Sequence, residues 1–406
     1  MREGVVSIGE DRAVFLTLCL ATSLSVLTAL SLSPFLATIG DDLNTSTALL
    51  GQAVMVASLV GGLVWLVIGP SAEWLGYRRL LLLGLVALVC CNVGIALAPA
   101  FGLLVAAQLL SGISAATISP MAFAIAGIRY HGDVRRQVIS RMFASASVAS
   151  IIGFPILTFI ASRSSWRWSF VALAFVAAAG LALTSITLDA DVISVHEPLR
   201  LRALLATYVP LVRHQPVALV YAAQFCRGVA WTGLLTYIGA FLVEELGRSL
   251  QEAGLIWLVL GPGFMTGSLL VSGPLRHISP RRTFFVTVVA MGLLIGVVFV
   301  VQPPILLTWA ALLSAAFFGG IAEVTAVTIM SAETPTAQGA TMALNSSITR
   351  FGTACGALIG GVLLAVGDYP AIGLGLPLVA LAAALVCARS GRGTREMGRV
   401  VLERGS

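Results

Sequence analysis

The sequence predicts an all-α polytopic membrane protein, with twelve transmembrane helices in two pseudo-symmetric six-helix bundles. The chain of 406 residues is 58% hydrophobic and only 10% charged, whereas a soluble domain carries about 25% charged residues. The bilayer is therefore the solvent that accommodates this apolar surface. A basic loop also occurs twice, as GPSAEWLGYRR at Gly69–Arg79 and as GPLRHISPRR at Gly273–Arg282. The offset of 273 − 69 = 204 is about half of the chain, which indicates a duplicated bundle.

Apolar runs of about 20 residues, the length of a spanning helix, define the twelve helices. The first six lie near 13–36, 46–68, 80–98, 101–126, 138–161 and 168–187, and the second six near 216–242, 252–272, 283–301, 304–330, 341–366 and 371–389. The longest polar connection separates the two sets. We therefore expect an N-terminal bundle over 1–187, a cytoplasmic linker over 188–215, a C-terminal bundle over 216–389 and a cytoplasmic tail over 390–406. Within the linker, we expect 199–212 to form a helix on the membrane surface.

The placement of arginine orients the chain. All 24 basic residues are Arg, and most of them fall in alternate connections and in the tail, while the opposite connections carry only Arg163, Arg167 and Arg248. Cytoplasmic loops collect positive charge, so we expect both termini on the cytoplasmic side of the plasma (inner) membrane of a bacterium. The same loops account for the net charge of +6, and we expect no nucleic-acid partner.

The reactive side chains exclude several classes of protein. The six cysteines lie inside apolar runs and the four histidines lie in polar connections, so neither set has the spacing of a metal site. A membrane-embedded enzyme needs a catalytic set such as Ser/His, paired Asp or HExxH, and no expected span contains a histidine. A nucleotide-binding motif is also missing from the sequence. We therefore expect no metal, no cofactor and no enzymatic activity.

The repeated loop resembles a motif of the major facilitator superfamily, G-x-L-a-D-r-x-G-r-k. The first copy keeps Gly69, Gly76 and Arg78 and has Glu73 in place of the Asp, and the weaker second copy keeps Gly273 and Arg282. Other segments are similar to the twelve-span drug:proton antiporter and sugar-efflux branch of that family: PFLATIGDDL at 34–43, GFP at 153–155, WRWSF at 166–170 and YIGAFLVEELGRSLQEAG at 237–254. The resemblance implies the major facilitator fold and a monomer. It also implies export of a small molecule by alternating access, with proton antiport.

One position departs from the family pattern. The fourth-span motif R-x-x-q-G of that family carries an Arg linked to proton coupling, and Gln108 stands in its place here. A proton-independent facilitator or an uptake symporter on the same fold is therefore the alternative function. A membrane-embedded enzyme or a lipid flippase is a remote alternative.

Three ionisable residues lie deep in the expected spans, where a charge costs about 2.5–3.5 kcal/mol and marks a functional candidate. They are Arg227, Glu323 and Arg350, which lie roughly 16, 10 and 14 Å from the nearer helix end at 1.5 Å per residue. We expect Glu323 to pair with Arg350, either as a proton-coupling element or as a structural pin. Arg227 has no evident carboxylate partner. The excess of positive charge favours a substrate with a carboxylate, a phosphate or another electron-rich group.

A polar stripe on the seventh span supplies the substrate-binding candidates. Gln224, Arg227 and Trp231 recur at i, i+3 and i+7 and share one helix face. The family resemblance places the first, fourth, seventh and tenth spans around a central cavity, which adds Gln108. Asp41 and Asp42, at the outer end of the first span, are proton-acceptor candidates, although a solvated helix terminus is the favoured interpretation.

Two further expectations concern helix contacts. Gly352, Gly356 and Gly360 repeat every four residues, as do Ser145, Ala149 and Gly153 in the matching span. Such small residues indicate close helix packing. In the first copy of the loop, we expect Glu73 to pair with Arg78 or with Arg141 and to act as a cytoplasmic latch.

Overall fold

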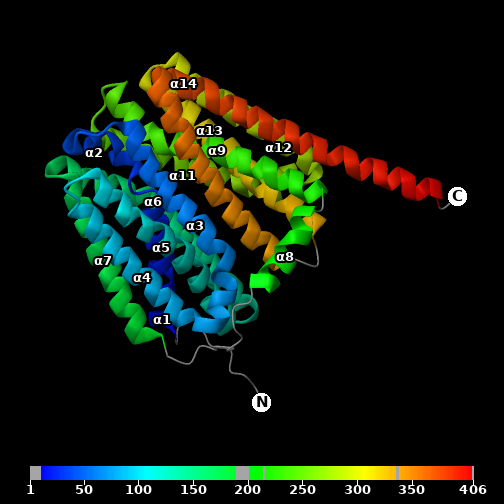
Figure 1. Cartoon of the computed structure of the whole chain (residues 1–406), viewed down its shortest axis with the longest axis horizontal. Helices are drawn as coiled ribbons and strands as arrows, with labels where there is room; N and C mark the ends of the chain where they lie inside the picture. Colours follow the sequence, from blue (N-terminus) through cyan, green and yellow to red (C-terminus); the bar gives the residue numbers. More distant parts are fainter. Residues whose placement is uncertain (1–10, 189–200, 214, 335–337, 405–406) are drawn as a thin grey trace. The chain divides into compact units, whose positions relative to one another are not determined.

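Helices form every regular element among the residues that the computed structural model describes, which are 11–188, 201–213, 215–334 and 338–404. They are α1 (Arg12–Ala29), η1 (Ser33–Phe35), α2 (Leu36–Leu43), α3 (Thr47–Leu75), α4 (Tyr77–Ala96), α5 (Phe101–Arg129), α6 (Gly132–Arg163), α7 (Trp166–Thr187), α8 (Leu201–Arg213), α9 (Gln215–Glu244), α10 (Leu250–Leu255), α11 (Trp257–Ser272), η2 (Pro274–His277), α12 (Pro280–Gly296), η3 (Val297–Val301), α13 (Ile305–Glu333) and α14 (Gln338–Arg404). Figure 1 shows their course. The helix expected near 199–212 is present as α8, and its placement on the membrane surface stays a prediction.

Eleven helical segments of the described chain are long and apolar enough to cross a membrane. The last of them, Ala340–Ser390, has 51 residues, more than twice the length that one crossing requires. It breaks at Gly367 and Asp368, whose φ angles are −156° and 53°, and Figure 1 shows the chain reversing there. The segment is therefore two spanning helices, and the predicted all-α fold of twelve transmembrane helices is confirmed.

The chain divides into two compact units. Unit 1 comprises Met1–Leu199 and Leu242–Trp257, and unit 2 comprises Arg200–Phe241 and Leu258–Ser406. The short segment 242–257 belongs to unit 1 because α10 packs against α6 and η1, and the Trp257 ring stacks on Phe154 at 4.3 Å. The bundle boundaries expected at 187 and 216 remain a prediction.

Unit 1 is built around α1, α4 and α5. In it, α1 packs against α5, α6 and α7, and α4 packs against α5 and α7. Helices α3 and α5 meet at Gly61 and Gly112, where a Cβ on Gly112 would lie 2.3 Å from the backbone oxygen of Ala57. Gly153 of α6 is as close to α1, since a Cβ there would lie 2.5 Å from Leu27.

Unit 2 uses glycine contacts in the matching places. A Cβ on Gly267 of α11 would lie 2.0 Å from the backbone oxygen of Phe317 on α13. On α14, Cβ atoms at Gly352, Gly356 and Gly360 would lie 2.5–2.9 Å from Phe225, Val229 and Tyr237 of α9, respectively. The close packing predicted from the four-residue glycine repeat is therefore confirmed. Helix α12 packs against α13 and α14.

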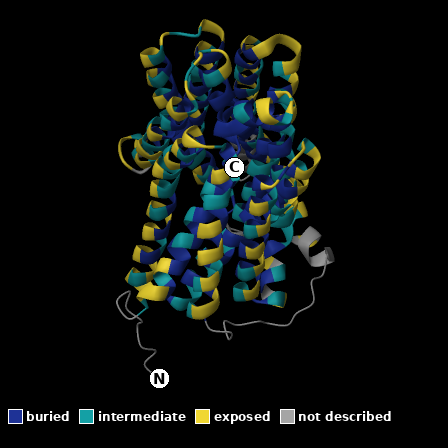
Figure 2. Cartoon of the chain, turned by 90° about the vertical axis from the view of Figure 1, so that its left-hand side faces the viewer, coloured by how far each residue is buried: buried dark blue, intermediate teal, exposed yellow. Residues whose placement is uncertain are grey.

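The helices carry apolar side chains on their exposed faces as well as inside the units. Phe175, Ile186, Leu306 and Val366 are each more than 70% exposed, and Figure 2 shows exposed and buried positions alternating along the helices. Exposed apolar surface on this scale is unusual for a soluble monomer. It matches a protein whose outer faces contact lipid.

Candidate functional site

Three helices of unit 2 bring Gln224, Arg227, Glu323 and Thr349 together. The amide nitrogen of Gln224 on α9 donates to both carboxylate oxygens of Glu323 on α13, at 3.1 and 3.2 Å. It also lies 3.5 Å from the Thr349 hydroxyl on α14. Arg227, one helical turn after Gln224, donates from Nε to the Gln224 amide oxygen at 2.8 Å and from Nη2 to Glu323. We call these four residues the polar cluster.

Burial makes the polar cluster sensitive to charge. Gln224 and Arg227 are 0% and 1% exposed, whereas the Glu323 side chain is 26% exposed. A buried guanidinium that loses its carboxylate costs several kcal/mol, so Arg227 depends on ionised Glu323. The Nη1 atom of Arg227 is buried and has no hydrogen-bond partner among the described residues. The cluster therefore contains one donor without an acceptor in the described part of the chain, Arg227 Nη1, beside the partly exposed carboxylate of Glu323.

The expected pairing of Glu323 with Arg350 is wrong. Glu323 pairs with Arg227 instead, and Arg350 forms no ion pair within the described part of the chain. The expectation assumed that consecutive spans at similar depth face each other. The side chains meet across the unit instead, because Gln224 and Arg227 share the face of α9 that contacts α13 and α14. Arg227 therefore does have a carboxylate partner. Thr349 was missed because a single Thr in an apolar run carries no distinguishing signal.

Trp231 lies one further turn along α9 and is 9% exposed. Its ring stacks on Phe264 of α11, with the ring centroids 5.9 Å apart, and a Cβ on Gly319 of α13 would lie 3.4 Å from it. The ring is thus packed inside unit 2. Gln108 lies on α5 in unit 1, where it is 3% exposed. A substrate contact for either residue remains a prediction.

The two acidic candidates of the first span differ in their surroundings. Asp41 is exposed. Asp42 accepts a hydrogen bond from Trp166 Nε1 at 3.2 Å and forms an ion pair with Arg167. Arg167 also donates to the backbone oxygen of Ala98 at 3.0 Å. Asp42 thus joins α2 to the start of α7, and Arg167 extends the contact to the turn after α4. This is a structural role, and the proton-acceptor role of Asp42 stays a prediction.

The first copy of the loop motif joins α3 to α4 and also reaches α7. Gly76 has a φ of 90°, which a residue with a side chain rarely adopts, so the motif needs glycine there. Arg78 donates to the backbone oxygens of Leu188 and Ser185, at 2.6 and 3.0 Å. These oxygens belong to the C-terminal turn of α7, where carbonyl groups lack helical partners. The Glu73 side chain, and with it the predicted latch, lies outside the described side chains, while Gly69 has open space around it.

In the second copy, the residue that acts like Arg78 is Arg281. Its Nε donates to Ser390 Oγ at 3.2 Å, and its Nη2 donates to Glu333 at 2.5 Å. Ser390 is the last residue of the final spanning segment, and Leu188 directly follows α7, the sixth span. The motif alignment selected Arg282 instead, which is exposed, and Gly273 is exposed too. Arg78 and Arg281 therefore both contact the end of the last spanning helix of their half, at an offset of 281 − 78 = 203, one residue from the offset that the sequence match indicated.

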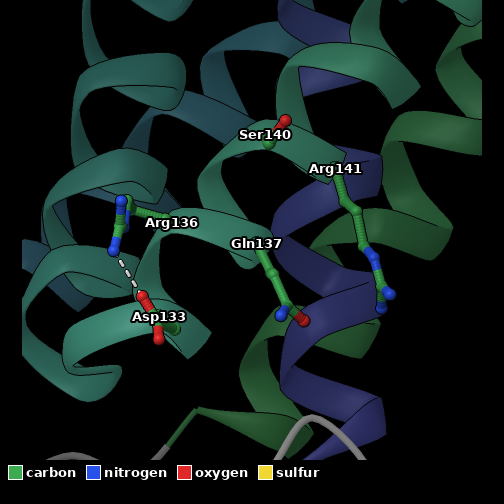
Figure 3. A pocket seen from close by; sticks show the side chains of 5 residues that line it. All are labelled: Asp133, Arg136, Gln137, Ser140 and Arg141. Atoms are coloured by element: carbon green, nitrogen blue, oxygen red, sulfur yellow. Dashed lines mark hydrogen bonds and ion pairs between the residues drawn. The ribbon is translucent and has the colours of Figure 1, made fainter.

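A cavity of about 510 Å³ lies at the N-terminal end of α6, lined by Asp133, Arg136, Gln137, Ser140 and Arg141. Figure 3 shows the ion pair between Arg136 and Asp133, with Arg141 extending away from it. All five side chains are exposed. The cavity is an open surface hollow, unlike the buried polar cluster.

Comparisons with known proteins identify the family. The family model for the Major Facilitator Superfamily matches residues 18–335 and 220–398. The chain is 25% identical over 338 residues to an uncharacterized MFS-type transporter, YceJ, of Bacillus subtilis (strain 168), covering 82% of this chain and 84% of YceJ. It is 27% identical over 291 residues to the probable efflux pump mfs2 of Aspergillus flavus, covering 62% of this chain and 66% of that protein.

A solved structure shares the fold. The nucleoside transporter NupG superposes with a TM-score of 0.79 at 12% sequence identity, covering 93% of this chain and 99% of NupG. The family and the fold are those of membrane transporters for small molecules and not of enzymes. The protein therefore belongs to the major facilitator superfamily and is a multi-pass membrane transporter.

Proposed function

We propose that the protein exports a small molecule across the bacterial plasma membrane in exchange for protons, and that Glu323 is the proton-binding residue. The observation that carries the proposal is the polar cluster. Glu323 lies 333 − 323 = 10 residues before the end of α13, about 15 Å along the helix. Every other acid in the described helices lies within two residues of a helix end or at the break in α14, except Glu396, which lies beyond the last spanning segment, Ala340–Ser390. Glu323 is thus the carboxylate placed to carry a proton through the bilayer.

The mechanism follows from the charge balance of the cluster. Ionised Glu323 neutralises Arg227, and protonation of Glu323 removes that neutralisation. A buried, uncompensated Arg227 then favours a rearranged state of the helices that carry it, which biases the equilibrium between two conformations. In this family fold, alternating access proceeds by rocking one half against the other around a midplane site. Both termini lie in the cytoplasm in this proposal, and the transporter acts as a monomer.

Antiport also restricts the substrate class. Proton and substrate must exclude each other, so the exported molecule takes the place of the proton at Glu323. A cation or a strong hydrogen-bond donor meets that requirement, and an anion does not. The name of the relative mfs2, a probable efflux pump, supports export.

One observation favours a second function. The unused Nη1 donor of Arg227 suits a substrate carboxylate or phosphate. An anion that takes Arg227 from Glu323 would favour a proton on Glu323, because the carboxylate loses its positive partner. Proton and anion would then bind together, which is the behaviour of an uptake symporter.

Accumulation in intact cells separates the two functions. Cells that express the protein would be loaded with a panel of labelled cationic drugs, sugars and organic anions, with and without a protonophore. Export by antiport predicts lower accumulation of at least one cationic or neutral compound, and the protonophore abolishes the difference. Higher accumulation of an anion would support the symporter and contradict export. Cells that express Glu323→Gln at the same level are the matched control.

A further inference from the structure

The side-chain amide of Gln224 has both of its ends engaged. Its nitrogen donates to the Glu323 carboxylate and its oxygen accepts from Arg227 Nε. Reversing the amide would set its nitrogen against the donor of Arg227 and its oxygen against the carboxylate, which are two repulsive contacts. Because Gln224 is 0% exposed, water does not replace the lost bonds. With Glu323 ionised, the amide therefore has one favourable orientation.

A proton on Glu323 reverses that preference. The Gln224 nitrogen is nearly equidistant from the two carboxylate oxygens, at 3.1 and 3.2 Å, so it lies between them. A protonated carboxyl group is itself a hydrogen-bond donor, and its hydroxyl hydrogen would meet the amide hydrogens. If the amide turns, its oxygen accepts the new hydroxyl. The same turn removes the acceptor from Arg227 Nε.

The charged surroundings of Glu323 are simple. Arg227 on α9 is the charged group that contacts it. On α14, the Thr349 hydroxyl contacts Gln224, and the neighbouring Arg350 forms no ion pair among the described residues. On α12, which also packs against α13, Arg281 binds Glu333 instead. Among the described residues, the contact to Glu323 therefore comes from one cation and one amide.

We propose that Gln224 is a positioning residue of the proton site: its amide turns when Glu323 takes up a proton, so that Arg227 loses the acceptor of its Nε together with its ionised partner. This inference rests on the proposed role of Glu323. Without the amide, protonation would remove the charge of the ion pair and leave the Nε bond of Arg227 in place. With it, a single proton removes both the ion pair and the 2.8 Å bond to Nε, and the turn places the amide oxygen beside the Thr349 hydroxyl. The proton comes from water and leaves to water, so no other reactant is needed.

Infrared difference spectroscopy tests the inference without a substrate. Spectra of the reconstituted full chain would be recorded at alkaline and at acid pH, with unlabelled glutamine and with glutamine labelled with ¹⁵N in the side chain. We expect a protonated-carboxyl band at acid pH that Glu323→Gln lacks. We also expect a side-chain amide band that changes with it, shifts with the label and is lost in Glu323→Gln.

Two variants assign the amide band. Gln224→Met keeps the length of the side chain and removes both hydrogen-bonding ends, so it should lose the amide band and keep the carboxyl band at a shifted position. Asn92→Leu removes another fully buried amide, on α4, and should leave both bands unchanged. The isotope shift assigns the band to a glutamine, and its loss in Gln224→Met assigns it to Gln224. Where Gln224→Met does not fold, Gln224→Asn keeps a side-chain amide but takes up no glutamine label, so the isotope shift should disappear in it.

The outcomes separate the inference from the proposed function. A carboxyl band that depends on Glu323, without an amide band that responds to the label, overturns the role of Gln224 and leaves proton binding at Glu323 intact. Lack of any carboxyl band that depends on Glu323 overturns both. An amide band that survives in Gln224→Met also overturns the inference, because another glutamine then responds.

Discussion

Arg227 and Glu323 form an ion pair that joins α9 to α13 across a sequence separation of 96 residues. The two partners are not equally buried, since Arg227 is 2% exposed at its side chain and Glu323 is 26% exposed. Arg does not deprotonate in proteins, whereas a carboxylate takes up a proton. The pair is therefore asymmetric. A glutamic acid that has lost its partner has a neutral form available, whereas an arginine that has lost its partner does not.

This asymmetry predicts unequal effects of removing each partner. Glu323→Leu should destabilise the protein by about 3 kcal/mol, because it leaves a buried, uncompensated guanidinium. Arg227→Leu should cost less, since the charge that it leaves is on Glu323, whose side chain is 26% exposed, and not on a fully buried group. The double variant should recover most of the loss. Melting temperatures of the four proteins in detergent measure this, and additive losses in the double variant would contradict a direct pairing.

Arg78 should stabilise the end of α7. Its two hydrogen bonds to the carbonyl oxygens of Leu188 and Ser185 are lost in Arg78→Ala. We expect a cost of about 1–2 kcal/mol, in the range of hydrogen bonds that involve a charged group, and a lower melting temperature. Arg79→Ala is the control, because Arg79 is exposed and adjacent. Equal melting temperatures for the two variants would show that the contact contributes nothing.

The close approach of α9 and α14 should not tolerate a side chain at Gly356. A Cβ there would lie 2.5 Å from the backbone oxygen of Val229, and backbone does not move aside as a flexible side chain does. We expect Gly356→Ala to cost about 1–3 kcal/mol, as overpacking does, and to reduce the yield of monodisperse protein in detergent. Gly102→Ala on α5 meets nothing within 4 Å and should behave as the natural sequence. A yield for Gly356→Ala as high as that of Gly102→Ala would argue against the packing.

Tyr130, between α5 and α6, should make stability fall in alkaline solution. Burial raises the pKa of its hydroxyl from 10.0 to about 12, and the nearby Asp11 carboxylate adds to that. The unfolded chain ionises near pH 10 while the folded chain keeps the proton, so the stabilisation is complete below pH 10 and is lost as the pH rises to about 12. Melting temperatures between pH 9 and 12 should therefore fall more steeply for the natural sequence than for Tyr130→Phe. Parallel curves would contradict this.

The sequence predicts those features of the fold that depend on local pattern. Spanning helices follow from the length of each apolar run, and the α9–α14 contact follows from glycines that repeat on one helix face. Gly76 was recognised within a motif, and its φ of 90° supplies the physical reason for it. These features depend on residues that are close together in the sequence, so they can be predicted from the sequence alone.

The candidate site depends on which helix faces meet, and the sequence does not contain that information in a local form. Gln224 and Arg227 were predicted to share a face, and they do. The choice of Arg350 as the partner of Glu323 failed because depth and order along the chain say nothing about rotation of a helix about its axis. Arg281 was missed for a similar reason: a one-residue shift in the repeat turns a different Arg toward α14.

Proton movement in everted membrane vesicles tests the central claim most directly. Respiration acidifies the vesicle interior and quenches a pH-sensitive dye, and a panel of drugs, sugars and organic anions is then added. Proton-coupled export through Glu323 predicts dequenching by at least one compound with the natural sequence, and none with Glu323→Gln at equal abundance in the membrane. Transport of a labelled compound without dequenching, or equal dequenching by Glu323→Gln, would contradict the account.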